Sequence, residues 1–364
     1  MRIVIRADSG NHIGAGHVMR CLTLANALRE KGTEACFVCR DYSGHLGQRI
    51  TDEGHRLHLL PTATQAIELV PDPAKSPPHA TWLGESWGTD LAQTQVALDG
   101  KHFDWLIVDH YALDNRWESA MRSTCSKIMV IDDLADRTHD CELLLDQTLG
   151  RNEKEYSPWV PENTILLTGA DYALLRPEFA EWRDYSLKRR AKSKMEHLLI
   201  SMGGVDQSNA TAQILEALQH CSLPTNCCIT VVMGDTSPWL DDVREYVKKL
   251  TWPTQVKVNV SNMAQLMADS DLAIGAAGST SWERCCLGLP AIMVVLAENQ
   301  QNIGLALEQK QAVTLLHKIS DIKKAVGLLC APTGDLGNMS QACRNITDGS
   351  GVETLLCHIE GMFG

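Results

Sequence analysis

The sequence predicts an α/β protein made of two doubly wound domains, each with a parallel sheet, that face one another across a cleft. Short, continuous apolar runs, such as 105–109 and 198–200, alternate with stretches of helical periodicity in both halves of the chain, as in parallel strands buried on both faces. In each half, the first strand leads into a glycine-containing loop that opens a helix. The 364 residues suit two ordinary domains. We therefore expect Rossmann-like domains over 1–176 and 196–364, with 177–195 as a connector.

The elements of the first half follow the order strand, helix, strand, helix, strand, which opens a doubly wound sheet. A loop over 71–90 holds four prolines and separates this unit from the later strands. The expected strands are 2–7, 35–39, 56–60, 105–109, 127–133, 143–147 and 165–167, and the expected helices are 18–31, 44–53 and 86–99.

The second half repeats the alternation after a charged helix over 178–195. Residues 196–204 are expected to form a strand that runs into a glycine loop. The other expected strands are 227–233, 256–260, 272–274 and 291–296, and the helices are 208–220, 238–250, 263–268, 281–287 and 303–310.

Charge and hydropathy restrict the class of partner. The net charge is −12, which argues against general binding of nucleic acid or of anionic membranes, although a local pocket for a phosphorylated small molecule stays possible. No apolar run approaches the ~20 residues that span a bilayer. The first residues form a short strand and not a signal peptide, so we expect a cytoplasmic protein. The basic run 188–194 is expected to be solvated.

The cysteines are expected to be buried thiols. Their number, thirteen, is odd, and several lie in apolar runs, as structural cysteines of a reducing compartment do. Cys36 and Cys39 form a C-x-x-C pattern inside an expected strand, where side chains alternate, and no second C-x-x-C completes a zinc site.

The loop after the first strand, residues 8–17, is the most distinctive stretch of the chain. It contains three glycines and two histidines and opens a helix. Backbone N–H groups and the helix dipole at such a position attract anions, and Gly14-x-Gly16 lets the backbone approach a ligand closely. Position 19 is Met, so the three-glycine dinucleotide fingerprint is absent.

His17 is the candidate general base. It stands at the mouth of the helix, where the positive field favours the neutral imidazole that can take a proton from water. His12 lies in the same loop and is the obvious competitor for this role.

Polar residues follow three of the expected strands. Asp109, His110 and Tyr111 end one strand, and polar groups at the carboxyl ends of parallel strands line the ligand crevice of open α/β sheets. Asp132, Asp133 and Asp146 end two others, where helix capping and turn formation explain them as well as ligand binding does.

The second half carries a set of motifs that are weak singly and more specific together. Small residues at 278–280 leave backbone N–H groups free for a diphosphate. Glu283, one turn further on, can accept both hydroxyls of a ribose, although an exposed helix acid is the simpler reading of this residue alone. With Gly203-Gly204 and Asn299-Gln300-Gln301 at other strand ends, the set favours nucleotide binding.

These motifs resemble those of known enzymes. The second half is similar to the nucleotide-sugar-binding domain of GT-B glycosyltransferases of the peptidoglycan N-acetylglucosaminyltransferase type. Across essentially the whole chain, the motifs resemble the nucleotide-sugar hydrolases of pseudaminic acid biosynthesis, with Trp282 where that family can carry Asn. The motifs are Arg6-x-Asp8, Ile13-Gly14-x-Gly16-His17-x-x-Arg20-Cys21, Val108-Asp109-His110-Tyr111, Tyr172-Ala173-Leu174-Leu175-Arg176-x-Glu178-Phe179, Met202-Gly203-Gly204-x-Asp206 and Ser279-Thr280-Ser281-Trp282-Glu283.

The resemblance implies a GT-B-like fold and the cleavage of UDP-2,4-diacetamido-2,4,6-trideoxy-β-L-altropyranose to UDP and the free sugar. It implies that His17 is the catalytic base, that Asp109 and Tyr111 lie near the sugar, and that the second domain holds UDP. The expected substrate-binding residues are Asp8, Gly14, Gly16, Asp109, His110, Tyr111, Gly203, Gly204, Asp206, Gly278, Ser279, Thr280, Glu283, Asn299 and Gln300.

We expect no cofactor and no metal, because no carboxylate cluster accompanies the expected diphosphate loops. Water is then expected to attack the anomeric carbon with inversion. The expected partner is a UDP-sugar, with no nucleic acid, no membrane and no second subunit. Two other functions stay open: a GT-B glycosyltransferase with a UDP-sugar donor, and a nucleotide-sugar-binding protein without catalysis. The sequence offers no basic, aromatic, amphipathic stretch for a membrane-bound acceptor, which favours water.

Overall fold

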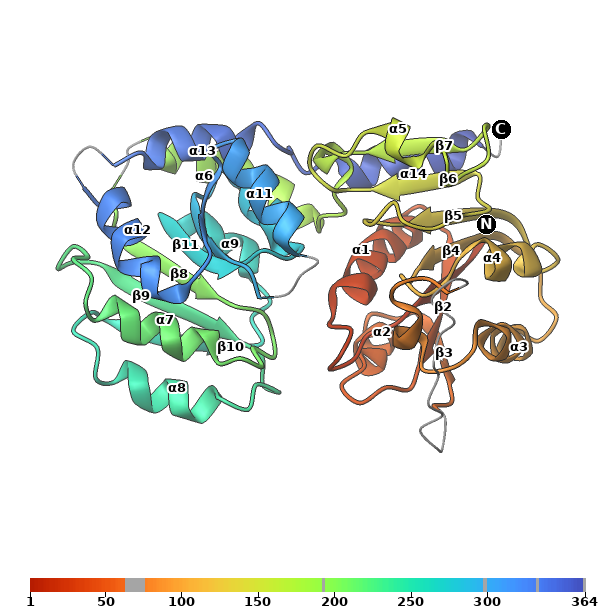
Figure 1. Ribbon diagram of the computed structural model, residues 1–364, viewed down its shortest axis with the longest axis horizontal. Coiled ribbons are helices and arrows are strands. Elements are labelled where there is room, and N and C mark those ends of the chain that lie inside the picture. Colours follow the sequence, from red (N-terminus) through yellow and green to blue (C-terminus); the bar gives the residue numbers. More distant parts are fainter. Residues whose placement is uncertain (63–75, 192–193, 297–299, 332–333, 363–364) are drawn as a thin grey trace. The chain divides into compact units, whose positions relative to one another are not determined.

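The computed structural model describes residues 1–62, 76–191, 194–296, 300–331 and 334–362 (Figure 1). The chain divides into two compact units. Unit 1 comprises Met1–Leu174 and Val352–Gly364, and unit 2 comprises Leu175–Gly351.

Unit 1 is built on a seven-stranded parallel sheet of order β3-β2-β1-β4-β5-β6-β7. The order reverses between β1 and β4, so the loops after these two strands meet at the switch point where open α/β sheets bind ligands. The strands are β1 Arg2–Ala7, β2 Glu34–Arg40, β3 Arg56–Leu60, β4 Phe103–Asp109, β5 Cys125–Ile131, β6 Leu143–Asp146 and β7 Ile165–Thr168. The helices are α1 Gly16–Glu30, α2 Gly47–Asp52, α3 Trp87–Leu98, α4 Asn115–Met121, α5 Glu153–Tyr156 and α14 Gly351–Gly361, with short 3-10 turns η1 Ala80–Leu83 and η2 Ala170–Tyr172.

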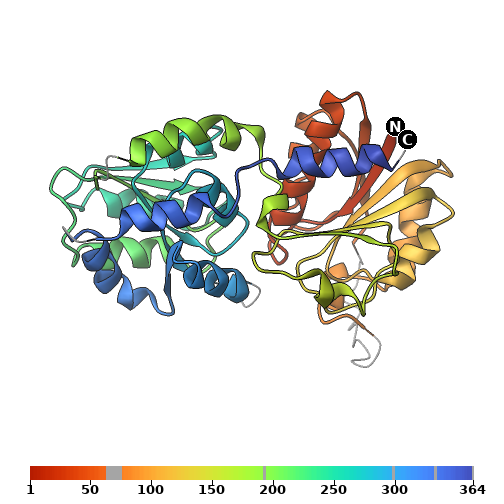
Figure 2. The same ribbon diagram turned by 90° about the horizontal axis from the view of Figure 1, so that it is seen from above.

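Apolar cores cover both faces of this sheet. On one face α1 and α14 lie side by side (Figure 2), and Leu22 and Leu355 share one buried cluster. The other face packs against Leu98 of α3 and Trp117 of α4. Cys36 and Cys39 belong to these two different clusters, as strand alternation requires. The C-x-x-C pattern therefore does not bring its two thiols together.

Unit 2 is built on a six-stranded parallel sheet of order β10-β9-β8-β11-β12-β13. Its switch point lies between β8 and β11. The strands are β8 His197–Ser201, β9 Cys228–Met233, β10 Thr254–Val258, β11 Leu272–Ala276, β12 Ala291–Val294 and β13 Val313–Leu316. The helices are α6 Pro177–Arg190, α7 Ala210–Leu218, α8 Leu240–Val247, α9 Met263–Asp269, α10 Thr280–Cys286, α11 Gln301–Gln309, α12 Ile322–Leu329 and α13 Leu336–Arg344, with the 3-10 turn η4 Ile319–Asp321.

The predicted fold class is confirmed: both units are parallel-sheet α/β structures. The division of the chain differs from the linear one expected above. The segment expected as a connector contains α6, which packs inside unit 2 against α9. The end of the chain returns to unit 1, because Leu355, Leu356 and Ile359 of α14 are buried in the core of that unit.

Several elements lie where the sequence analysis placed none, namely α4, α5, β13, α12, α13 and α14. The loop expected over 71–90 contains η1 and the start of α3, while residues 71–75 lie outside the described part of the chain. Within the described part, no helix combines the length and the apolar character needed to cross a membrane.

Candidate functional site

His17 and Asp109 meet at the switch point of unit 1. His17 is the second residue of α1, and Asp109 is the last residue of β4. The Nδ1 atom of His17 lies 2.6 Å from Oδ1 of Asp109, and the imidazole is 8% exposed. Because a carboxylate can only accept, the hydrogen of this contact is on Nδ1, and in the neutral imidazole Nε2 then holds the lone pair. The pair therefore has the tautomer that a general base requires.

Arg20 holds Asp109 in place from the next turn of α1. Its Nε lies 2.7 Å from Oδ2 and its Nη2 lies 2.7 Å from Oδ1 of Asp109, a bidentate arrangement. Burial alone would raise the pKa of Asp109, but the charges of Arg20 and His17 hold it well below the usual range. The sequence analysis did not assign Arg20 to the site. Arg20 follows His17 by three positions, so both side chains lie on one face of the helix. This spacing is the sequence signal that could have identified Arg20 as a site residue.

Tyr111 connects His17 to a second carboxylate. Its hydroxyl donates to Oδ2 of Asp133 at 2.6 Å, and its ring lies edge-on to that of His17, with the centroids 4.6 Å apart. Burial and the charge of Asp133 raise the pKa of Tyr111, so the phenol stays protonated. Arg20 reaches the same carboxylate, with Nη1 2.7 Å from Oδ2 of Asp133.

Asp8 and His110 lie inside unit 1, beneath the loop. Asp8 is fully buried and is held by Arg6 at 2.5 Å and by the backbone N–H of Arg40 at 2.7 Å. His110 accepts from the backbone N–H of Ala112 at its Nδ1, and its Nε2 lies 3.2 Å from Oδ2 of Asp8. Both residues are therefore placed to support the loop from below, and their expected contact with substrate stays a prediction.

The loop of residues 10–14 is closed on itself. Gly10 and Gly14 form an antiparallel bridge, and Gly14 has a φ of +85°, which side chains other than glycine rarely adopt. His12 is exposed at its tip, with its ring edge-on to Tyr42 at 4.7 Å. No carboxylate among the described residues pairs with His12, which distinguishes it from His17.

The other strand-end acids are paired with arginines and turns. Asp132 lies 2.7 Å from Arg137 and accepts from the backbone N–H of Ala135. Asp146 lies 2.6 Å from Arg151 and accepts from the backbone N–H of Thr148. These contacts match the turn chemistry that the sequence left open. Across the part of the chain that the structure describes, no group of three or more His, Cys, Asp and Glu side chains is arranged to hold a metal ion.

In unit 2, the loop after β8 contains Gly203, Gly204 and Asp206. Both glycines are exposed, and Gly203 has a φ of +102°. Asp206 is 6% exposed, and its two oxygens accept from the backbone N–H groups of Ala210 and Thr211 at 2.9 Å. The carboxylate thus caps α7 and occupies N–H groups that an anion would otherwise use.

The loop after β11 contains Gly278, Ser279 and Thr280, at or near the surface. Their backbone N–H groups donate no hydrogen bond to any residue that the structure describes. Glu283 follows one turn later in α10, with its side chain 16% exposed. Burial raises the pKa of Glu283, opposed mainly by the charge of Arg176, whose Nη2 lies 3.5 Å from Oε1. The loop offers free donors, and Glu283 offers a partly accessible carboxyl.

Arg284, the neighbour of Glu283, is a buried cation that the sequence analysis did not single out. It is 3% exposed, and its Nη2 donates to the carbonyl of Ala276 at 2.8 Å and to Oγ of Ser281 at 3.1 Å. It forms no ion pair with any described residue, and burial lowers its pKa. The backbone of the loop therefore lies next to a buried guanidinium whose hydrogen-bond partners are neutral oxygens, which favours an anion there.

Three further residues complete the comparison with the expected site. Asn299 lies outside the described residues. Gln300 accepts from the backbone N–H of Leu296 at 3.1 Å. Trp282 is 2% exposed, so its indole belongs to the core and is not presented at the surface.

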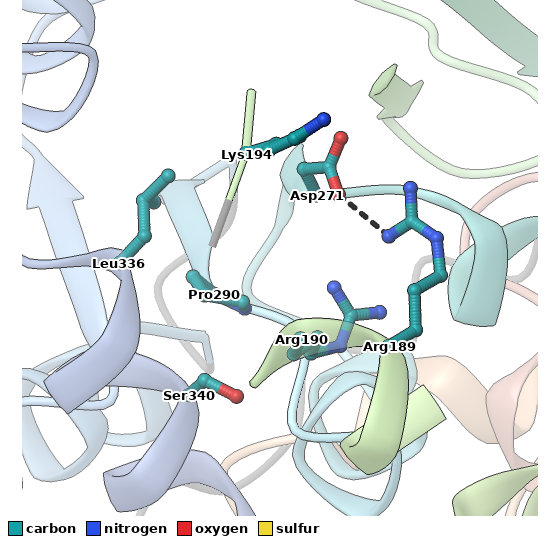
Figure 3. A pocket seen from close by; sticks show the side chains of 7 residues that line it. All are labelled: Arg189, Arg190, Lys194, Asp271, Pro290, Leu336 and Ser340. Carbon is teal, nitrogen blue, oxygen red and sulfur yellow. Dashed lines mark hydrogen bonds and ion pairs between the residues drawn. The ribbon is translucent and has the colours of Figure 1, made fainter. Parts of the chain in front are cut away.

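A separate pocket in unit 2 shares no residue with these loops. It is lined by side chains of α6, α13 and the segments around β8, β11 and β12 (Figure 3), which are Arg189, Arg190, Lys194, Asp271, Pro290, Leu336 and Ser340. Arg189 lies 2.5 Å from Asp271. Arg190 donates to the carbonyl of Met267, in the last turn of α9, and to the carbonyl of Leu287, which directly follows α10. Arg190 is thus buried, contrary to the solvated basic run expected from sequence, because it caps helix ends. The arginines that line this pocket are therefore explained by their contacts within unit 2.

The chain is similar to known proteins along part or all of its length. The model of the glycosyltransferase family 28 C-terminal domain matches residues 198–324. An uncharacterised protein of Methanocaldococcus jannaschii is 26% identical over 82% of this chain, and the chain spans 56% of that relative's length. The UDP-2,4-diacetamido-2,4,6-trideoxy-β-L-altropyranose hydrolase of Campylobacter jejuni is 25% identical over 85% of this chain and 97% of its own. The spore coat polysaccharide biosynthesis protein SpsG of Bacillus subtilis is 22% identical over 100% and 99% of the two chains.

Solved structures share the fold at low identity. MurG of Acinetobacter baumannii has a TM-score of 0.68 at 14% identity, covering 99% of both chains. HepE of Anabaena in complex with UDP-glucose has a TM-score of 0.55 at 12% identity, covering 100% of this chain and 99% of its own. The fold is therefore that of the GT-B glycosyltransferases. Fold and homologues together support a nucleotide-sugar-related protein of the GT-B class.

Proposed function

We propose that this protein hydrolyses UDP-2,4-diacetamido-2,4,6-trideoxy-β-L-altropyranose to UDP and the free sugar, a step of pseudaminic acid biosynthesis. The observation that carries the proposal is the pair formed by His17 and Asp109, with Nδ1 and Oδ1 2.6 Å apart at the switch point of unit 1. The relative of Campylobacter jejuni that bears the name of this hydrolase aligns along 97% of its length and supports the choice of substrate.

In this proposal, Nε2 of His17 takes a proton from water as the water attacks the anomeric carbon. Asp109 accepts the hydrogen of Nδ1 throughout, fixes the ring and stabilises the imidazolium that forms. Arg20 keeps Asp109 ionised and oriented. Attack opposite the departing UDP inverts the anomeric configuration. A diphosphate is a good leaving group, so the reaction needs no strong general acid.

Unit 2 supplies the UDP site in this proposal. The backbone N–H groups of Gly278, Ser279 and Thr280 receive the diphosphate, and Glu283 accepts the ribose hydroxyls. Arg284 lies next to the same loop, so its buried charge adds to the attraction for the diphosphate. Gly203 and Gly204 leave space for the ligand to approach the end of β8.

A GT-B glycosyltransferase is the second candidate, favoured by the match of residues 198–324 to a glycosyltransferase domain. In that case the base would activate an acceptor hydroxyl instead of water. The two functions differ in whether UDP is released without an acceptor.

The test is to incubate the purified protein, without acceptor, with a small panel of UDP-diacetamido-trideoxy sugars and UDP-N-acetylglucosamine. We expect UDP and free sugar in equal amounts from the altropyranose derivative, and their release to be slower by ~10²–10⁴-fold with His17→Ala. UDP release that starts only when a sugar or lipid acceptor is added indicates a transferase. Tight binding of the UDP-sugar without any release indicates a binding protein.

A further inference from the structure

The turn before α3 brings two aromatic side chains against Tyr111. The ring centroids of His79 and Trp82 lie 4.8 Å apart, and they lie 5.6 Å and 5.7 Å from that of Tyr111. Tyr111 in turn contacts His17 edge-on at 4.6 Å. A continuous aromatic cluster of His79, Trp82 and Tyr111 therefore adjoins the candidate base.

The turn that carries this cluster is held firmly. The backbone N–H of Ala80 donates to Pro77 and that of Trp82 donates to His79. Leu83, next to Trp82, is 1% exposed and fills the core. The hydroxyl of Tyr42 donates to the carbonyl of Trp82 at 3.0 Å. The backbone that carries the indole is thus held in place before any ligand binds, which lowers the entropic cost of binding.

The exposure of the cluster is not explained by packing. Trp82 and His79 are only half-buried, although Leu83 already provides the core contact of the turn. The nearby carboxylates of Asp109 and Asp133 are both paired with Arg20. The cluster is consequently an aromatic surface beside the candidate base, with the guanidinium of Arg137 5.9 Å from the centroid of the Tyr111 ring, and it suits a ligand with apolar groups.

We propose that His79 and Trp82, together with Tyr111, bind the apolar groups of the sugar and make this chain select a 6-deoxy diacetamido sugar over sugars that keep hydroxyl groups at C4 and C6. The inference rests on the proposed function and adds its specificity determinant. The C6 methyl and the acetyl methyls of a diacetamido-trideoxy sugar have the size and polarity to cover the exposed ring faces. A hydroxymethyl group at C6 would instead lose its hydration against an aromatic surface.

The test compares Trp82→Ala and Trp82→Phe with the wild type, using the diacetamido-trideoxy UDP-sugar and UDP-N-acetylglucosamine. Trp87→Ala is the matched control, because Trp87 is an exposed tryptophan of the same unit that lies outside the cluster. We expect Trp82→Ala to raise KM for the deoxy sugar about 10- to 100-fold. We also expect it to reduce the ratio of the kcat/KM values for the two donors. We expect Trp82→Phe to keep most of the preference and the affinity for UDP alone to stay within twofold in every variant. An unchanged KM and preference in Trp82→Ala overturns the inference, as does an equal loss for both donors and for UDP.

Calorimetry on the same proteins separates this inference from the proposed hydrolysis. If the wild type releases no UDP but binds the deoxy UDP-sugar more tightly than UDP, and Trp82→Ala removes that difference, hydrolysis is overturned and the inference stands. If the wild type hydrolyses the sugar and Trp82→Ala behaves like it, the inference is overturned and hydrolysis stands. A wild type that binds no UDP-sugar of the panel overturns both.

Discussion

The Nδ1 atom of His17 and the Oδ1 atom of Asp109 lie 2.6 Å apart although 92 positions separate the two residues in the sequence. The contact exists because β1 and β4 are neighbours in the sheet, so the loops after them meet. It fixes which nitrogen of the imidazole carries the hydrogen.

Replacing His17 should abolish most turnover and leave nucleotide binding unchanged. His17→Ala removes the general base, which typically contributes ~10²–10⁴-fold, whereas the expected UDP contacts belong to unit 2. His12→Ala is the control, because His12 has no carboxylate partner among the described residues. Steady-state kinetics and UDP calorimetry check both variants. Near-normal turnover in His17→Ala, with a loss in His12→Ala, would transfer the role to His12.

Asp109→Asn should reduce kcat by roughly 10²–10⁴-fold, because an amide no longer stabilises the imidazolium or selects its tautomer. The change also leaves the buried Arg20 without a full counter-charge and should destabilise unit 1 by about 3–5 kcal/mol. Asp132→Asn is the matched control, because it removes the counter-charge of the buried Arg137 in the same way. Urea unfolding should show similar losses of stability in both variants, and kinetics below the transition should show the large loss of kcat in Asp109→Asn alone. Equal losses of kcat would mean that Asp109 acts only through the fold.

Glu283→Ala should weaken UDP binding by about 1.5–3 kcal/mol, the usual loss for hydrogen bonds to a charged group. Burial raises the pKa of this carboxyl, so the affinity for UDP should decline as the pH falls through that raised value, earlier than for an ordinary glutamate. Glu178→Ala removes the other carboxylate next to Arg176 and serves as the control. Calorimetry across pH that finds the same affinity in Glu283→Ala and the wild type contradicts the ribose contact.

Hydrolysis in ¹⁸O-water should place the label in the sugar and not in UDP. Attack on phosphorus usually relies on a metal ion held by carboxylates, whereas the proposed reaction uses His17 to direct water at carbon. Mass spectrometry of both products and NMR of the first-formed anomer check the position of attack and the inversion. Excess EDTA should leave the rate unchanged. Label in UDP would instead indicate attack at phosphorus, and loss of activity with EDTA would indicate that the reaction needs a metal ion.

Asp146 should make unit 1 less stable as the pH rises from about 4 to about 6. Burial, together with the charge of Asp133, raises its pKa to about 6. Between the unfolded and folded pKa values the folded protein keeps a proton that the unfolded chain has released, so the free energy of unfolding falls with rising pH. The loss amounts to roughly 2–3 kcal/mol. Asp146→Asn should therefore gain stability relative to the wild type between pH 4 and pH 7 in urea titrations. If the difference in the free energy of unfolding between Asp146→Asn and the wild type does not change with pH, this role of Asp146 is refuted.

The sequence was sufficient to predict most of the strands and the loops that meet at each switch point. Asp109 follows an apolar run that can hardly be anything but a buried strand, and His17 opens a helix after three glycines. These two signals are local in the sequence. The carboxyl ends of parallel strands lie at the same edge of the sheet, so the polar residues that follow them lie at that edge too.

The partners of these residues could not be predicted, because they depend on distant positions. The sequence singled out Asp8 but could not show that Arg6 and the backbone N–H of Arg40 bind it, or that both arginines also bind Asp90 from α3. The sequence also singled out Asp206 but could not show that its oxygens accept from the first backbone N–H groups of α7. Trp82 lay in a proline-containing loop with no periodic pattern, so only the folded turn shows that it contacts Tyr111.

The place of α14 has a consequence for how the protein is made. The helix follows all of unit 2 in the sequence, yet it completes the core of unit 1 with Leu355, Leu356 and Ile359. During synthesis, unit 2 can therefore fold as an uninterrupted segment, while the earlier-made unit 1 must wait with an open apolar face. A chain that ends after residue 350 would keep unit 2 and lack the last helix of unit 1, so unit 1 should be the more dependent on chaperones.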